Sequence, residues 1–125
     1  MKRALVLLAH GARNPAWAAP FEQLADRLAR SRPDWTVKLA FLELMPPDLP
    51  TCLADIATTG ARDVEVFPLF LGGSGHVLRD VPPLLDEARA RWGLHITLHA
   101  ALGQQPGMVD AMAQVCLAAV EGSGS

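Results

Sequence analysis

The sequence predicts one α/β domain in which a single four-stranded parallel sheet is flanked by helices on both faces. Half of the 125 residues are hydrophobic, which is enough for one core, and no linker or repeat divides the chain. Four runs of strand length are each followed by apolar residues at helical spacing. Strands that alternate with helices form parallel sheets covered on both faces. The strand runs are residues 3–9, 36–44, 64–71 and 94–100.

The first strand and helix are joined by a turn that contains a helix start. Residues 4–9 of the predicted strand 3–9 are a continuous apolar run, and Asn14 followed by Pro15 is typical of an N-cap and first helical position. The helix should run to about Arg30, because four apolar residues then recur on one face: Trp17, Phe21, Leu24 and Leu28.

The second unit has the same pattern, with prolines between strand and helix. Apolar residues alternate from Val37, and the strand should end near residues 42–44. Two prolines at 46 and 47 exclude a helix there, and Asp48 can cap the next one. That helix should stop before Gly60, with an apolar stripe of Leu49, Leu53, Ile56 and Ala57.

The third strand enters a glycine-rich loop that ends in His76. A helix should follow from about Asp80 to Gly93, and residues 94–100 alternate as a strand nearer the sheet edge. Residues 1–120 should form the domain, with a disordered tail at 121–125. The last helix is amphipathic, with a stripe of Met108, Ala111, Met112, Val115 and Ala119.

Charge and cysteine content limit the classes of function. A net charge of −2 provides no basic surface for nucleic acid or an anionic membrane, so we expect small molecules or protein chains as partners. The apolar run at residues 4–9, which follows Lys2 and Arg3, is too short for a signal peptide, which favours a cytoplasmic protein. No CxxC is present, and Cys52 and Cys116 fall near apolar helix stripes, so buried free thiols are expected.

Three metal-compatible residues follow three different strands. His10, Glu43 and His76 each stand at or just past a predicted strand end. Ligands of parallel sheets bind at the carboxyl ends of the strands, so these side chains should converge on one edge. Two imidazoles and a carboxylate suit a divalent transition metal, and histidine can also accept a proton near neutral pH. His95 and His99 share a strand face and are interpreted as partly exposed strand residues.

The segments that contain His10, Glu43 and His76 resemble the corresponding segments of the small sirohydrochlorin chelatases of the CbiX/SirB type. The resemblance is carried by residues 8–15, 40–44 and 68–82, in the same order and at matching separations. It implies a lyase-class chelatase that inserts a divalent metal, Co²⁺ or Fe²⁺, into sirohydrochlorin without ATP, in cobalamin or sirohaem biosynthesis. It also implies a (βα)4 half-chelatase domain that forms a homodimer to complete the cleft.

The resemblance further implies roles for individual residues. His10 and His76 would be catalytic, and both would bind metal together with Glu43. No tightly bound cofactor is implied, since the metal (Co²⁺, Fe²⁺ or Ni²⁺) is a substrate. The substrate carries many carboxylates, for which arginines and loop N–H groups are suitable partners. The candidates are Arg13, Gly72, Gly73, Ser74, Gly75 and Arg79.

Other classes of function remain open at this point. A metal-carrying protein could use the same three ligands without catalysis. A histidine phosphatase would have a similar His-Gly after its first strand, but position 9 is alanine where that motif requires arginine. A phosphate-binding loop at residues 72–75 lacks both a Lys-Ser/Thr ending and a GxGxxG pattern.

Overall fold

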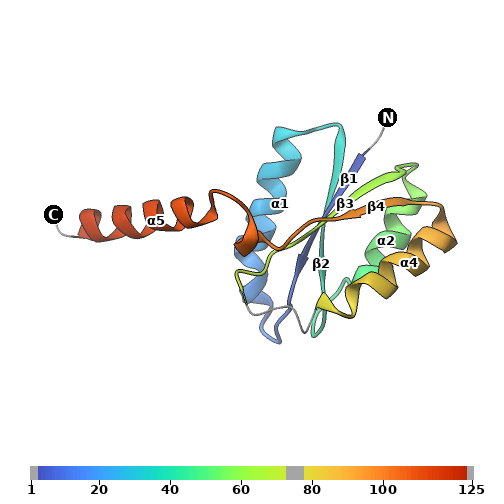
Figure 1. Ribbon diagram of the computed structural model, residues 1–125, viewed down its shortest axis with the longest axis horizontal. Coiled ribbons are helices and arrows are strands. Elements are labelled where there is room, and N and C mark those ends of the chain that lie inside the picture. Colours follow the sequence, from blue (N-terminus) through green and yellow to red (C-terminus); the bar gives the residue numbers. More distant parts are fainter. Residues whose placement is uncertain (1–2, 73–77, 124–125) are drawn as a thin grey trace.

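The computed structural model describes residues 3–72 and 78–123, and its elements alternate as the sequence predicts (Figure 1). The 3₁₀ helices are labelled η. In chain order the elements are β1 (Arg3–Ala9), η1 (Pro15–Ala18), α1 (Ala19–Ser31), β2 (Trp35–Phe41), α2 (Leu49–Thr58), β3 (Asp63–Pro68), α4 (Val81–Trp92), β4 (His95–Leu98), η2 (Leu102–Gln104) and α5 (Met108–Ser123).

The four strands form one parallel sheet in the order β2-β1-β3-β4. In the register of the central strand, Leu5 lies between Val37 of β2 and Glu65 of β3. Helix α1 packs against β2 on one face, while α2 and α4 cover the other face (Figure 1). The predicted fold class, a parallel sheet with helices on both faces, is confirmed.

The core lies mainly between the sheet and helices α2 and α4. Side chains alternate along each strand, so Val6 and Val66 point to this face and pack with Leu53 and Leu85 of the helices. A smaller cluster around Phe41, Ala18 and Trp17 fills the space below α1 and η1. Packed side chains therefore cover both faces of β1 and β2, the strands that lead into the predicted site.

The predicted helix caps form, although Asn14 caps the 3₁₀ helix η1 and the α-helix α1 begins only at Ala19, four residues later than predicted. The Asn14 side chain accepts a hydrogen bond from the Ala16 N–H at 3.0 Å, and Asp48 accepts one from the Thr51 N–H at 2.9 Å. Gly93 ends α4 in a left-handed conformation with φ 67°, which glycine adopts without steric cost. These caps fix where the chain enters and leaves the helices beside the sheet.

Three strands end earlier than predicted, and β3 ends at Pro68 instead of residue 71. Strand β2 ends at Phe41 instead of residues 42–44, because the Phe41 N–H bonds to the Pro47 carbonyl as the chain turns back toward α2. Strand β4 covers only His95–Leu98, although the His99 N–H still bonds to Val66 of β3. The residues after these strand ends are thus free to form the loops of the carboxyl edge.

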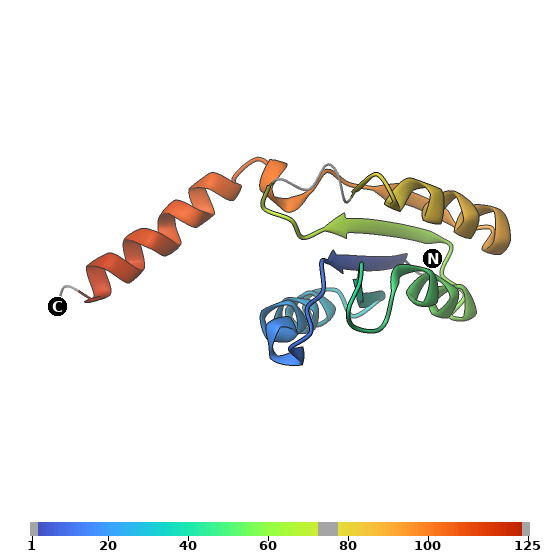
Figure 2. The ribbon, with the colours of Figure 1, turned by 90° about the horizontal axis from the view of Figure 1, so that it is seen from below.

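Helix α5 extends away from the rest of the protein (Figures 1 and 2). Every residue from 109 to 122 is exposed, so the expectation of a buried Cys116 is wrong, whereas Cys52 is buried as predicted. The helix continues to Ser123, so the tail expected to be disordered from residue 121 is helical over its first three positions. The amphipathic pattern correctly predicts a helix but not its surroundings.

Among the described residues, no helix is both long and apolar enough to cross a membrane.

Candidate functional site at the carboxyl edge of the sheet

His10 and Glu43 meet at the carboxyl edge of the sheet. Their atoms Nε2 and Oε1 are 3.0 Å apart, and the side chains are 45% and 58% exposed. The pair forms because backbone pairing continues beyond both strands: the Leu42 N–H bonds to the Ala9 carbonyl, and the Glu43 N–H bonds to the His10 carbonyl at 3.1 Å. Two residues far apart in sequence are therefore held side by side by the β1–β2 register. We call them the carboxyl-edge pair.

Gly11 allows the two loops to approach closely. It has a φ of 102°, and a Cβ atom at this position would overlap the carbonyl oxygen of Glu43. Only a residue without a side chain tolerates both the conformation and the contact. The glycine that follows the histidine thus positions the glutamate, a role that a strand-and-turn interpretation of the sequence does not reveal.

The surroundings of the pair combine one aromatic ring with a strained loop. The His10 ring contacts the buried Phe70 edge-on, with centroids 6.2 Å apart. Leu44, next to the glutamate, has a φ of 69°, and its side chain is 56% exposed. A leucine in this region costs about 1–3 kcal/mol, and such strain gathers at functional sites. A hollow of about 440 Å³ adjoins Glu43, lined by residues 42–48 and Thr51.

The carboxyl-edge pair has the chemistry of a half-formed metal site. A carboxylate oxygen and an imidazole nitrogen at this separation share either a proton or a divalent cation, and both side chains remain open to solvent. In the part of the chain that the structure describes, no third His, Cys, Asp or Glu completes a cluster around them. The third predicted ligand, His76, lies outside the described residues.

The predicted substrate-binding residues are only partly described. Arg13 is exposed in the loop after His10, and Arg79 is exposed just before α4. Gly72 is exposed after β3. Gly73, Ser74 and Gly75 lie outside the described residues. The geometry thus joins His10 to Glu43, and the remaining site residues stay predictions.

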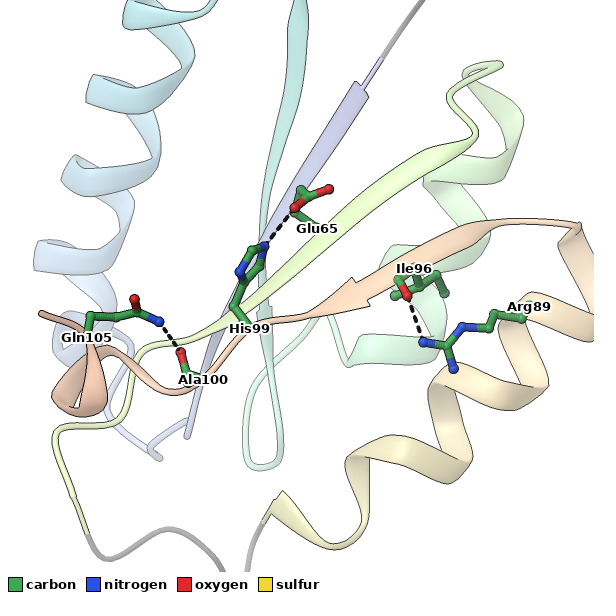
Figure 3. Close-up of polar contacts among 6 residues, drawn as sticks. All are labelled: Glu65, Arg89, Ile96, His99, Ala100 and Gln105. Atoms are coloured by element: carbon green, nitrogen blue, oxygen red, sulfur yellow. Dashed lines mark hydrogen bonds and ion pairs between the residues drawn. The ribbon is translucent and has the colours of Figure 1, made fainter.

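A second His–Glu pair lies elsewhere, on the face of the sheet. His99 Nε2 is 2.7 Å from Glu65 Oε1 (Figure 3). The His99 ring also stacks on Phe67, with centroids 5.6 Å apart. We call it the sheet-face pair. Sequence reasoning treated His99 as a partly exposed strand residue and missed its partner. The signal is the β3–β4 register, which places Glu65 opposite Thr97, two residues before His99.

The fold and the carboxyl-edge pair define a small α/β protein with a metal-compatible site at the ends of its parallel strands. The family model CbiX matches residues 4–119, and the chain belongs to this family. A CbiX protein of Marinobacter aquaeolei VT8, described as a putative cobalamin biosynthesis protein, has a similar crystal structure. The two structures match with a TM-score of 0.82 at 30% identity, and the match covers 95% of this chain and 98% of the Marinobacter chain.

Longer relatives match over part of their length. The sirohydrochlorin cobaltochelatase of Methanococcoides burtonii is 30% identical over 84 residues, which cover 67% of this chain and 64% of that protein. SirB of Bacillus subtilis, solved with Fe³⁺, has a TM-score of 0.76 at 23% identity, covering 91% of this chain and 46% of SirB. SirB of Bacillus subtilis subspecies spizizenii, a sirohydrochlorin chelatase solved in complex with cobalt, has a TM-score of 0.72 at 24% identity. The match covers 91% of this chain and 49% of that SirB chain. This chain therefore has the fold of about half of SirB.

Proposed function

We propose that this protein inserts a divalent metal ion, Co²⁺ or Fe²⁺, into sirohydrochlorin without ATP. The observation that carries the proposal is the carboxyl-edge pair: His10 and Glu43 lie 3.0 Å apart at the exposed end of parallel strands in a CbiX-family chain. Ligands of such sheets bind at this edge. An imidazole and a carboxylate that are both accessible suit a metal that must be received and then released.

The names of the similar proteins support the proposed metal insertion. The Methanococcoides burtonii protein is a sirohydrochlorin cobaltochelatase, and the two SirB structures contain Fe³⁺ and cobalt. This chain matches just under two thirds of the first relative and about half of SirB, so the activity of the whole proteins is extended to it as a proposal. The product would enter cobalamin or sirohaem biosynthesis in the cytoplasm.

In the proposed mechanism, His10, Glu43 and His76 hold the incoming metal on one face of the macrocycle. Insertion requires the metal to lose bound water and two pyrrole nitrogens to lose protons. A neutral histidine within hydrogen-bond reach of the ring can take up a proton, so His10 and His76 are the proposed catalytic residues. Metal binding and proton acceptance compete for one imidazole nitrogen, so a histidine takes up one ring proton as it releases the metal, and the other ring proton passes to solvent water.

The carboxylates of the macrocycle would contact the loops around the metal. Arg13 follows the first histidine by three residues, and Arg79 follows the second by three. Guanidinium groups form strong paired hydrogen bonds with carboxylates. Backbone N–H groups of the loop Gly72, Gly73, Ser74 and Gly75 would supply further donors. We also propose a homodimer, because one chain has the fold of about half of SirB.

Metal insertion is measured directly by the change in the visible spectrum of sirohydrochlorin. The assay is run with Co²⁺, Fe²⁺ and Ni²⁺ in parallel, and His10→Ala and His76→Ala should each lower the rate by at least about 100-fold. His95→Ala is the matched control, because His95 is exposed and begins β4 at the opposite edge of the sheet. Full activity in both site variants would refute the mechanism, and metal binding without any acceleration would instead indicate a metal-carrying protein.

A further inference from the structure

Helix α5 is apolar around most of its circumference, yet it is exposed along its length. Between residues 108 and 121 its polar side chains are Asp110, Gln114 and Glu121. At 3.6 residues per turn these three lie within about 40° of one another. A helix with so narrow a polar stripe is typical of a buried position.

The side of α5 opposite the polar stripe forms a continuous apolar surface, which we call the α5 stripe. Its members are Met108, Met112, Val115, Cys116 and Ala119. Val115 is 69% exposed. Leu117 is 57% exposed but projects on the polar side. Val115 in the stripe and Leu117 outside it are thus two exposed apolar side chains that can be compared by substitution.

The same chain carries a sheet face that a helix of this length would fit. We call it the open sheet face: Glu65 and Phe67 of β3, Thr97 of β4, and His99. Thr97 is exposed, and Phe67 is half-buried. On this side of the sheet α1 packs against β2, whereas α4 contacts β4 from the opposite side. The 16 residues of α5 span about 24 Å and the six of β3 about 20 Å.

The segment before α5 is anchored so that the helix points away from its own sheet (Figures 1 and 2). The Gly103 N–H donates to the Phe70 carbonyl at 2.9 Å, and the Gln105 side chain donates to the Ala100 carbonyl at 2.8 Å (Figure 3). A Cβ at Gly103 would overlap the Leu71 carbonyl oxygen, so the backbones are in close contact. Docking of α5 on its own sheet face would require a different chain direction between these anchored residues and Met108, where α5 begins.

Two exchanged helices would bury an area typical of a stable dimer. Half the surface of a helix about 24 Å long and about 10 Å wide is about 380 Å², and the sheet face it covers loses a similar area. Two such contacts remove about 1,500 Å² from water, close to the standard size of specific interfaces of about 1,600 Å². The acidic residues Asp110 and Glu121 would stay on the outer side, in contact with water.

We infer that α5 is exchanged between two copies of this chain, with the α5 stripe of each copy docked on the open sheet face of the other. The inference gives a contact to the homodimer proposed above and does not depend on the metal chemistry. Since η2 contacts Phe70 and Leu71 beside His10, each exchanged helix leaves its own chain next to the carboxyl-edge pair. The exchange would therefore bring the carboxyl edges of the two copies near one another.

The first test compares two substitutions on α5 by sedimentation equilibrium. Wild type should be a dimer at micromolar concentration. Val115→Glu should raise the dimer dissociation constant at least about tenfold, because it places a charge in the buried stripe. Leu117→Glu, the matched control on the polar side, should change it less than about twofold. Circular dichroism checks that both variants stay folded. A monomeric wild type, or equal effects of the two variants, would overturn the inference.

The second test separates exchange from docking within one chain. One copy carries Thr97→Cys with Cys116→Ser, and a longer, tagged second copy keeps Cys116. A bis-maleimide linker should join the two copies of different length. Cys52 is buried, which raises the pKa of its thiol to about 12, so it should not react. A single chain that carries Thr97→Cys and keeps Cys116 is treated alongside. If this chain links only within itself and the two copies of different length do not join, the helix docks on its own sheet and the exchange is refuted.

Discussion

The protein contains two His–Glu pairs of similar geometry and different setting. His10 and Glu43 lie 3.0 Å apart in loops beyond the strand ends, with side chains 45% and 58% exposed. His99 and Glu65 lie 2.7 Å apart on the sheet, with side chains 38% and 25% exposed, and the histidine stacks on Phe67. The first pair is open at the edge where parallel sheets bind ligands. The second is held by an aromatic ring on the face that we propose to be covered.

The comparison shows that position in the fold, and not residue type, distinguishes a candidate metal site from an ordinary polar contact. Strand register creates both pairs. Only the first lies in loops beyond the strand ends, where Gly11 lets the loop after His10 pack against the backbone of Glu43. The predictions below test this difference, from the largest expected effect to the smallest.

Removal of the histidine should weaken metal binding strongly in the carboxyl-edge pair and hardly at all in the sheet-face pair. His10→Ala should weaken Co²⁺ binding by at least about 100-fold, because a direct ligand is lost. His99→Ala should change it less than about twofold. Titration of the cobalt absorption bands measures both. A similar loss in the two variants would mean that the pairs do not differ in function.

Gly11→Ala should break the geometry that creates the carboxyl-edge pair. The new Cβ meets the Glu43 carbonyl, so we expect a loss of about 2–4 kcal/mol in the free energy of unfolding together with weaker Co²⁺ binding. Gly60→Ala is the matched control, because Gly60 also has a positive φ, of 87°, but open space around it. It should cost about 1 kcal/mol and leave metal binding unchanged. Urea unfolding of both variants measures the two losses in the free energy of unfolding. Equal losses would exclude a close contact between Gly11 and Glu43.

Asp48→Ala should loosen the helix start that follows the Glu43 loop. Hydrogen bonds from the Thr51 hydroxyl and N–H lower the pKa of Asp48, and loss of the cap should cost about 1 kcal/mol at pH 7. A lowered pKa in the folded state means that this stabilisation is present above the pKa of the unfolded chain and is lost as the pH falls through the folded value. The difference from wild type should therefore shrink below about pH 4. Asp55→Ala, which removes an exposed acid on the same helix, is the matched control and should change the free energy of unfolding at pH 7 by less than about 0.5 kcal/mol.

The sheet-face pair should contribute least to stability. Both side chains are partly exposed, so a double-mutant cycle with Glu65→Gln and His99→Ala should give a coupling free energy of about 0.2–1 kcal/mol. Thermal unfolding at a concentration where all four proteins are in the same oligomeric state supplies the values. A coupling free energy above about 2 kcal/mol would show that this pair contributes more to stability than its partial exposure predicts.

Most of the fold was predictable because its signals are local. The caps at Asn14, Asp48 and Gly93 act within a few residues of where they stand, and the apolar runs of the strands match the sheet. The meeting of His10 and Glu43 also follows from sequence, since parallel strands place their ends at one edge. These parts depend on spacing and on a general rule of topology.

The remaining features depend on contacts between distant segments. Sequence shows that Cys116 lies on an apolar helix, but not what covers that helix, so its exposure was not foreseen. The partner of His99 depends on the register of two strands separated by a whole helix. The role of Gly11 depends on a backbone contact that leaves no pattern in composition. The site was thus predictable as a location, whereas the way it is held was not.

The central claim, that the carboxyl-edge pair and not the sheet-face pair handles the metal, is tested most directly by anomalous scattering from crystals soaked in Co²⁺. The account predicts a cobalt peak about 2 Å from His10 Nε2 and from a Glu43 carboxylate oxygen, with His76 as a further ligand. A cobalt ion bound between Glu65 and His99, with none at His10, would contradict it.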